Sequence, residues 1–152
     1  MADNAIGTAE LLNDAVTDAK TSSTIEKTLV FLYDGISQTA SAKTLTHRDG
    51  VTAQTLPAGA IVKSFYIDST TAFTSDGSAT LALGWTGAAA AIMAATAFDN
   101  AAIAIATAGW TNSATAAGAT GGLGGAKSVL LTIGTAAITA GDCYVYITYI
   151  EA

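Results

Sequence analysis

The sequence predicts an all-β domain, folded as an antiparallel β-sandwich or jelly roll and preceded by an N-terminal arm or short helix. Three observations indicate this fold class. From residue 25 onward, apolar residues recur with a period of two, as in half-buried strands. Turn signals such as Asp-Gly separate these segments at short intervals, and the segments do not alternate with helical patterns. We therefore expect an arm over residues 1–25 and one sandwich domain over residues 26–152.

The N-terminal segment differs from the rest of the chain because its apolar residues recur at helical spacing. These residues are Ala9, Leu12, Val16 and Ala19, with Thr8 as a possible N-cap. A short helix or an extended arm would each suit docking onto a neighbouring subunit, and a frayed terminus is equally compatible. We place Leu11, Leu12 and Val16 among the candidate interface residues.

The remaining chain divides into short strands and turns. Strands are expected at residues 27–33, 60–69, 79–85, 101–107, 128–133 and 143–150. Residues 88–95 are rich in alanine and could form two helical turns beside the sheet. A loop rich in Ser and Thr is expected after the Asp34-Gly35 turn, and it carries residues 47–50. A longer loop is expected over residues 109–125, and a turn at residues 140–142 precedes the last strand.

The last strand has no polar face. Its inward or outward alternation places Tyr144 and Tyr146 on one side and Cys143, Val145 and Ile147 on the other. One interpretation is a central strand beneath a covering loop. The other is that Tyr144 and Tyr146 contact another subunit, because tyrosine joins apolar area to a hydrogen-bonding hydroxyl and is enriched at interfaces.

Composition narrows the possible partners. Charged residues make up 12% of the chain, about half the usual share, so the surface has little electrostatic defence against association. The net charge is −6, and the six Lys and Arg residues are scattered, which predicts no nucleic-acid partner and no anionic membrane surface. The most apolar stretch, residues 87–108, is interrupted by Asp99 and Asn100, so we expect no membrane span. The N-terminus lacks the pattern of a signal peptide, which predicts a cytoplasmic place of synthesis and assembly.

A search for catalytic chemistry in the sequence finds no convincing site. The single histidine, His47, lies in a polar loop, and the single cysteine, Cys143, lies within a strand and is expected to be a small buried residue. The carboxylates Asp14 and Asp18 lie four residues apart, and an exposed face of the arm explains them without a metal. The glycine-rich residues 121–128 resemble a phosphate-binding loop, but Ala126 breaks the spacing and a strand follows. We expect no enzyme, no cofactor and no metal.

Two segments resemble known proteins. Residues 56–87, LPAGAIVKSFYIDSTTAFTSDGSATLALGWTG, and residues 134–152, GTAAITAGDCYVYITYIEA, resemble the capsid decoration or cement proteins of tailed bacteriophages. The resemblance covers roughly residues 50–152 and is a pattern of turns and strands. It implies a β-sandwich on the outside of a capsid lattice that bridges adjacent major capsid proteins. It also implies a homotrimer, as is frequent at three-fold positions of such lattices.

The leading hypothesis is therefore a virion structural protein on the capsid exterior, with the major capsid protein and its own copies as partners. An alternative is a carbohydrate-binding module of a tail or fibre, in which Trp85 and Trp110 would stack on sugars. Trp85, however, alternates like a core residue. A surface-layer or fibre subunit of the host is a third hypothesis, and an enzyme is the last.

Overall fold

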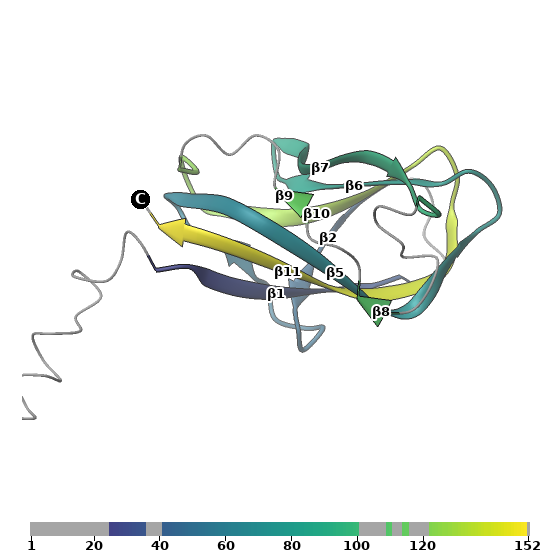
Figure 1. Ribbon diagram of the computed structural model, residues 1–152, viewed down its shortest axis with the longest axis horizontal. Helices are drawn as coiled ribbons and strands as arrows, with labels where there is room; N and C mark the ends of the chain where they lie inside the picture. The colour runs from purple at the N-terminus through teal and green to yellow at the C-terminus, as the bar shows by residue number, and fades with distance from the viewer. Residues whose placement is uncertain (1–24, 36–40, 101–108, 111–113, 116–121, 152) are drawn as a thin grey trace, which may run out of the picture.

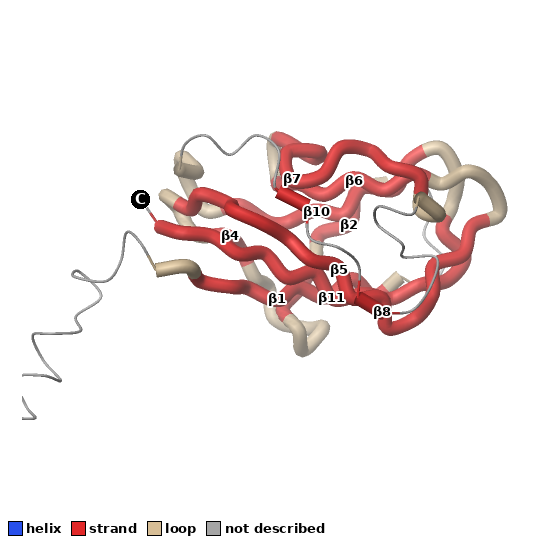
Figure 2. The backbone as a smooth tube through the Cα atoms, in the orientation of Figure 1, coloured by secondary structure: helices blue, strands red, loops and turns tan. Residues whose placement is uncertain are grey.

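Two antiparallel sheets stack face to face, as Figure 1 and Figure 2 show. The computed structural model describes residues 25–35, 41–100, 109–110, 114–115 and 122–151. Its strands are β1 (Lys27–Asp34), β2 (Ala42–Thr44), β3 (Thr46–His47), β4 (Thr55–Leu56), β5 (Ala60–Ser75), β6 (Thr80–Trp85), β7 (Ala88–Ala97), β8 (Gly109–Trp110), β9 (Ala114–Thr115), β10 (Lys127–Gly134) and β11 (Ile138–Glu151). The expected all-β sandwich is confirmed.

The strand order resolves the choice between a simple sandwich and a jelly roll. One sheet has the order β3-β1-β11-β5-β8, with β9 also paired to β5, and the other has the order β2-β10-β6-β7, with β4 paired to β10. The pairs β1–β11, β2–β10, β5–β8/β9 and β6–β7 are those of one long antiparallel hairpin rolled across two sheets. That arrangement is a jelly roll.

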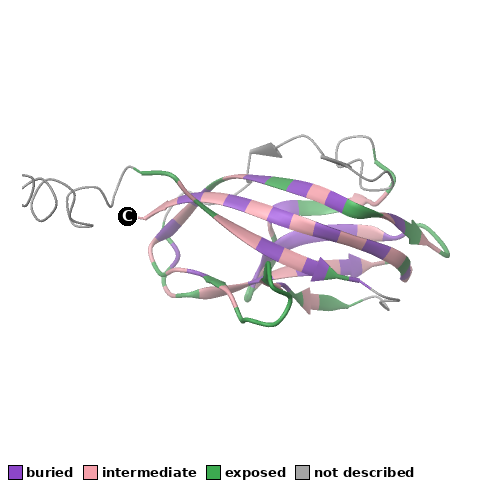
Figure 3. Cartoon of the chain, turned by 90° about the horizontal axis from the view of Figure 1, so that it is seen from below, coloured by how far each residue is buried: buried purple, intermediate pink, exposed green. Residues whose placement is uncertain are grey.

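The core lies between the two sheets and is built by alternation along each strand. In β11, Val145 and Ile147 are 0% exposed, while Tyr144 and Tyr146 between them are only partly buried. Figure 3 shows the same alternation along the long strands. Inward residues of β6 and β10, such as Leu83 and Leu131, close the core from the other sheet. Trp85 is 8% exposed and belongs to this core, as its alternation predicted.

The turn expected at residues 140–142 is wrong, since these residues lie within β11. The register between β11 and β5 shifts on both sides of Ala140 and again between Asp142 and Cys143, so the segment is a series of β-bulges. Gly141 has a φ of 137°, and a Cβ there would lie 2.5 Å from the ring of Phe73. The Gly-Asp pair that resembled a turn signal therefore lets β11 bend around an aromatic side chain.

The helical alternative for residues 88–95 is also wrong, because these residues belong to strand β7. Trp85 pairs with Ala88 and Leu83 with Met93, so the short connection returns the chain directly onto β6. Sheet pairing and the burial of Ile92 outweigh the helix propensity of alanine.

Several shorter expectations are corrected or lie outside the structure. The Ser- and Thr-rich loop expected after the Asp34-Gly35 turn contains the short strands β2 and β3, and the loop expected over residues 109–125 contains β8 and β9, which pair with β5. The strand expected at residues 101–107 and the arm at residues 1–25, apart from Ile25, lie outside the described residues.

Candidate interaction surface

The outer face of the six-stranded sheet is apolar where three long strands meet. Across β1 and β11, Val30 pairs with Tyr146 and Leu32 with Tyr144. Across β11 and β5, Tyr146 pairs with Tyr66. We call the outward positions of β1, β11 and β5 the tyrosine face; its apolar members are Val30, Leu32, Ile61, Tyr66, Tyr144, Tyr146 and Ile150.

The side chains of this face are partly accessible. Tyr66 is 39% exposed, and Tyr144 and Tyr146 are partly buried. Cross-strand aromatic and β-branched pairs of this kind stabilise a sheet by roughly 0.2–1 kcal/mol each. The face is therefore ordered before anything binds to it, which lowers the entropic cost of an interface.

Charged groups lie at the margin of the tyrosine face. The guanidinium carbon of Arg48 lies 5.7 Å from the ring centroid of Tyr144, which is a cation–π contact. On the opposite side, Asp68 pairs with Tyr144 across β11 and β5. An apolar centre with a charged rim is the usual anatomy of a protein–protein interface.

The outer face of the other sheet is built from smaller residues. Outward positions of β6 and β10 include Ala82, Gly84 and Thr132, with Leu130 as the larger apolar side chain. Gly84 is covered by β7, because a Cβ there would lie 2.2 Å from the carbonyl oxygen of Ala88. The two outer faces of the sandwich are thus chemically different.

The structure places the predicted interface residues as follows. Tyr144 and Tyr146 point outward from β11, opposite to Cys143, as the alternation predicted. β11 is also a central strand, lying between β1 and β5. Leu11, Leu12 and Val16 lie outside the described residues, so their interface role stays a prediction.

The other apolar members of the face were not singled out in the sequence; they are Val30, Leu32, Ile61, Tyr66 and Ile150. Each of them lies on a strand that the sequence predicted. Only the strand register, however, joins the three strands into one surface.

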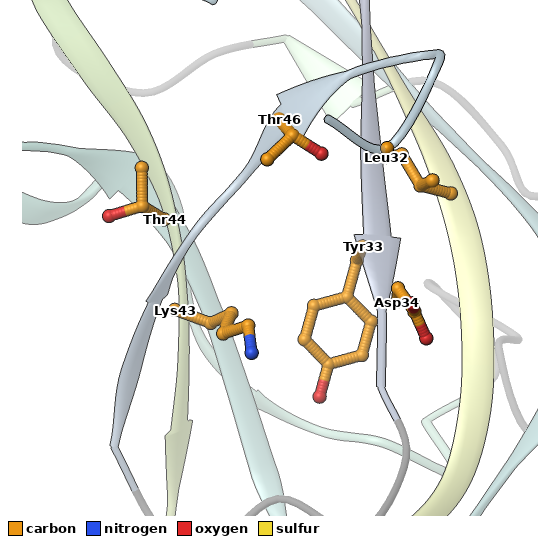
Figure 4. Close-up of a pocket in the computed structure, with 7 residues that line it drawn as sticks. Leu32, Tyr33, Asp34, Lys43, Thr44 and Thr46 are labelled. Carbon is orange, nitrogen blue, oxygen red and sulfur yellow. The ribbon is translucent and has the colours of Figure 1, made fainter. Parts of the chain in front are cut away.

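A pocket of about 240 Å³ opens beside β1 (Figure 4). Its lining residues are Leu32, Tyr33, Asp34, Lys43, Thr44, Thr46 and Gly50. Tyr33 and Lys43 extend into the space between β1 and β2 from opposite sides.

The Tyr33 hydroxyl is buried and has no hydrogen-bond partner among the described residues. Burial raises the pKa of Tyr33 well above its ordinary value, so the hydroxyl stays protonated. The lining holds no nucleophile paired with a base.

The residues considered for chemistry are not brought together. Cys143 faces the core and is 1% exposed, and burial raises the pKa of its thiol. His47 is exposed, with its Nδ1 3.3 Å from the carboxylate of Asp49. The carboxyl pKa of Asp49 is held below its usual range by hydrogen bonds from Thr52 and from the Val51 amide.

The other site patterns were also tested against the structure. The glycine-rich segment leads into β10 at Lys127 rather than into a helix N-terminus. In the described part of the chain, no group of three His, Cys, Asp or Glu residues is placed to hold a metal ion. Nor do the described residues contain a helix long and apolar enough to cross a membrane.

Comparisons with known proteins identify the fold. No protein-family model matches the sequence, and no curated protein is significantly similar to it. A chain of the cyanophage Pam1 capsid asymmetric unit is 25% identical, with a TM-score of 0.56 over 86% of this chain and 87% of that chain. A chain of the capsid of Ralstonia phage GP4 is 14% identical, with a TM-score of 0.57 over 90% and 89%. A chain of the acid-stable capsid of Helicobacter pylori bacteriophage KHP30 is 12% identical, with a TM-score of 0.55 over 84% and 89%.

The class of protein is thus a β-sandwich of a kind that phage capsids contain. The GP4 and KHP30 likenesses show the fold alone. The Pam1 likeness adds sequence similarity over most of both chains and supports a structural role in a virion.

Proposed function

We propose that this chain is a virion structural protein that binds the outside of a phage capsid lattice and bridges its major capsid proteins. The observation that carries the proposal is an apolar tyrosine face on a fold shared with chains of three phage capsids. The residues that would make the contact are Tyr144 and Tyr146, with Val30, Leu32 and Tyr66 beside them. The protein would act by adhesion, without catalysis or a cofactor.

The size of the face favours repeated contacts over one tight pair. Three strands spaced about 4.8 Å apart and a length of about 20 Å give an area of roughly 300 Å². A stable pairwise interface buries about 800 Å² on each partner. The tyrosine face alone would therefore hold a single partner weakly. Copies joined to one another, in the proposed homotrimer, would bind a shell with avidity.

The charge of the chain agrees with this mode of binding. With a charged fraction of 12%, the surface gives little long-range repulsion or steering. Affinity would then come from apolar and hydrogen-bonding contacts, to which tyrosine is suited. We therefore expect shell binding that changes little with ionic strength.

The test is co-sedimentation with shells assembled from the cognate major capsid protein. Tyr66→Lys places a charge on the most exposed tyrosine of the face and should reduce shell binding at least tenfold. Thr44→Lys adds the same charge on the exposed face of the other sheet and serves as the matched control. Equal loss in both variants would count against the tyrosine face. Absence of binding by the unaltered protein would refute the capsid role itself.

A further inference from the structure

A lysine and a buried tyrosine hydroxyl meet in the pocket beside β1. Lys43 of β2 pairs with Leu131 of β10, which belongs to the core, so Lys43 faces the space between the two sheets. Tyr33 of β1 faces the same space from the other sheet and is 0% exposed. Both residues line the pocket of about 240 Å³, and Figure 4 shows their side chains extending toward each other.

The Tyr33 hydroxyl is a fixed donor without an acceptor. Three buried side-chain polar atoms lack a hydrogen-bond partner in the described part of the chain, those of Tyr33, Gln54 and Thr132, and only Tyr33 lines the pocket. Its ring stacks on Phe73, with the centroids 5.7 Å apart and the planes 19° from parallel, and it lies against Gly35, so it cannot turn away. Burial raises the pKa of the hydroxyl, which therefore keeps the proton that it can donate.

Lys43 faces the interior without a counter-charge. The ion pairs between described residues join Lys27 to Glu151 and His47 to Asp49, and neither pair includes Lys43. A lysine that points into a domain is normally paired, because an ammonium group that loses water needs an anion to compensate. The pocket therefore holds one neutral and one positively charged donor.

The nearby carboxylates do not fill this role. Asp34 also lines the pocket, but successive residues of a strand point to opposite faces, so Asp34 leaves β1 on the side away from Tyr33. In Figure 4 the β1 ribbon lies between Asp34 and the side chains of Tyr33 and Lys43. Asp142, which pairs with Asp34, accepts a hydrogen bond from the amide of Gly35. These two carboxylates weaken an anion site but leave it unoccupied.

We propose that the pocket beside β1 binds a carboxylate group, which accepts hydrogen bonds from the Tyr33 hydroxyl and the Lys43 ammonium group. A ligand atom between two donors must be an acceptor, and the charge of Lys43 selects an anionic one. The volume of about 240 Å³ is larger than the roughly 30 Å³ of one water molecule and smaller than the roughly 300–1,000 Å³ of pockets for drug-sized ligands. It therefore suits a short carboxylate with a few carbon atoms.

Two sources can supply that carboxylate, a free small acid or the Asp or Glu side chain of a partner protein. Leu32 lines the pocket and is also a member of the tyrosine face, so the pocket adjoins that face. A partner seated on the tyrosine face can therefore reach the pocket with an acidic side chain. The carboxylate site does not depend on the proposed function, whereas the second source rests on it.

An NMR titration of the full-length chain with sodium acetate tests the site. Two hydrogen bonds opposed by two nearby carboxylates predict weak binding, with a Kd of about 1–10 mM. Acetate should shift the Tyr33 ring and Lys43 resonances saturably, while sodium chloride at the same ionic strength should not. Acetamide has the shape of acetate without its charge and should bind about tenfold more weakly or worse.

Variants separate the two donors. Lys43→Met removes the charge, keeps an unbranched side chain and should weaken acetate binding about tenfold or more. Tyr33→Phe removes the neutral donor and should weaken acetate binding about threefold to tenfold. Lys63→Met removes the same charge from an exposed residue of β5 outside the pocket lining and should leave acetate binding unchanged. Circular dichroism confirms that each variant is folded.

Shell binding separates the two sources. If Lys43→Met weakens both acetate and shell binding while Lys63→Met weakens neither, the carboxylate comes from the capsid protein. If Lys43→Met weakens acetate binding alone, the site stands and its ligand is a free acid.

Three results would overturn the carboxylate site: no saturable shift with acetate, equal binding of acetate and acetamide, or equal acetate affinity in Lys43→Met and Lys63→Met. Failure of the unaltered protein to bind shells would refute the capsid role instead, and the acetate titration would still decide whether the pocket binds a carboxylate.

Discussion

Gly84 offers a strict test of the packing between β6 and β7. A Cβ at this position would lie 2.2 Å from the carbonyl oxygen of Ala88 and 2.4 Å from the carbonyl carbon of Ala89. These are backbone atoms, so no rotamer change relieves the overlap. The Gly84→Ala substitution would force β7 away from β6 by about 1 Å, and overpacking of this kind costs 1–3 kcal/mol.

We expect the upper part of that range, about 2–3 kcal/mol, because the strand itself must move. For a chain of this length, the corresponding decrease in Tm is roughly 5–10 °C. Thermal and urea unfolding followed by circular dichroism would measure it. The urea midpoint should fall while the m-value stays constant, which is the signature of lost stability without a changed denatured state.

Two other glycines provide matched controls. Gly87 has a φ of 95° and no atom within 4 Å of an added Cβ, so Gly87→Ala should cost about 1 kcal/mol through backbone strain alone. Gly124 has neither a positive φ nor a close contact, so Gly124→Ala should change stability by less than about 1 kcal/mol. If Gly84→Ala were as stable as Gly124→Ala, the placement of β7 over β6 would be wrong.

Three further predictions follow from buried and hydrogen-bonded groups. Tyr33→Phe removes a buried hydroxyl that lacks a partner among the described residues, so urea unfolding should show unchanged stability or a gain of about 1 kcal/mol; a clear loss would mean that the hydroxyl is bonded. Cys143 is buried and its thiol pKa is raised, so a thiol reagent should modify it in denaturant at once but in the native protein no faster than unfolding. Hydrogen bonds lower the carboxyl pKa of Asp49 in the folded protein, so their contribution to stability is complete above the unfolded pKa of about 3.9 and is lost progressively as pH falls from there through the lowered folded pKa. Asp49→Ala should therefore lower the Tm at pH 7, and the difference from the unaltered protein should shrink at pH 2–3; a constant difference would contradict this.

The fold was largely predictable because alternation is a local signal. Large apolar residues alternate with smaller ones along β6, and successive residues of β11 from Cys143 onward point to opposite faces. Both strands could therefore be located from residue types alone. The alanine run of β7 was not resolved, since alanine fits a helix or a strand and only the pairing with β6 decides between them. Gly141 was interpreted as a turn because the local sequence of a glycine bulge resembles that of a turn, and the ring of Phe73 that it accommodates is distant in sequence.

The candidate surface was predictable only in part. The period of two along β11 identified Tyr144 and Tyr146 as residues that point away from Cys143 on an apolar strand. Their neighbours Val30 and Tyr66 join them through register across three strands that are far apart in the chain. No local sequence pattern encodes that register. The sequence therefore identified the part of the face that lies on β11, but not the parts that lie on β1 and β5.

The two outer faces differ in the side chains that they hold, and this difference bears on how a charged variant on each sheet should behave. Tyr66, Tyr144 and Tyr146 lie on the outer face of one sheet. On the outer face of the other sheet, Ala82 is 6% exposed and Gly84 is covered by β7, while Thr44 at its edge is exposed. Because the proposed adhesive face lies on the first sheet, the proposal predicts that a charge at Thr44 is tolerated where a charge at Tyr66 is not.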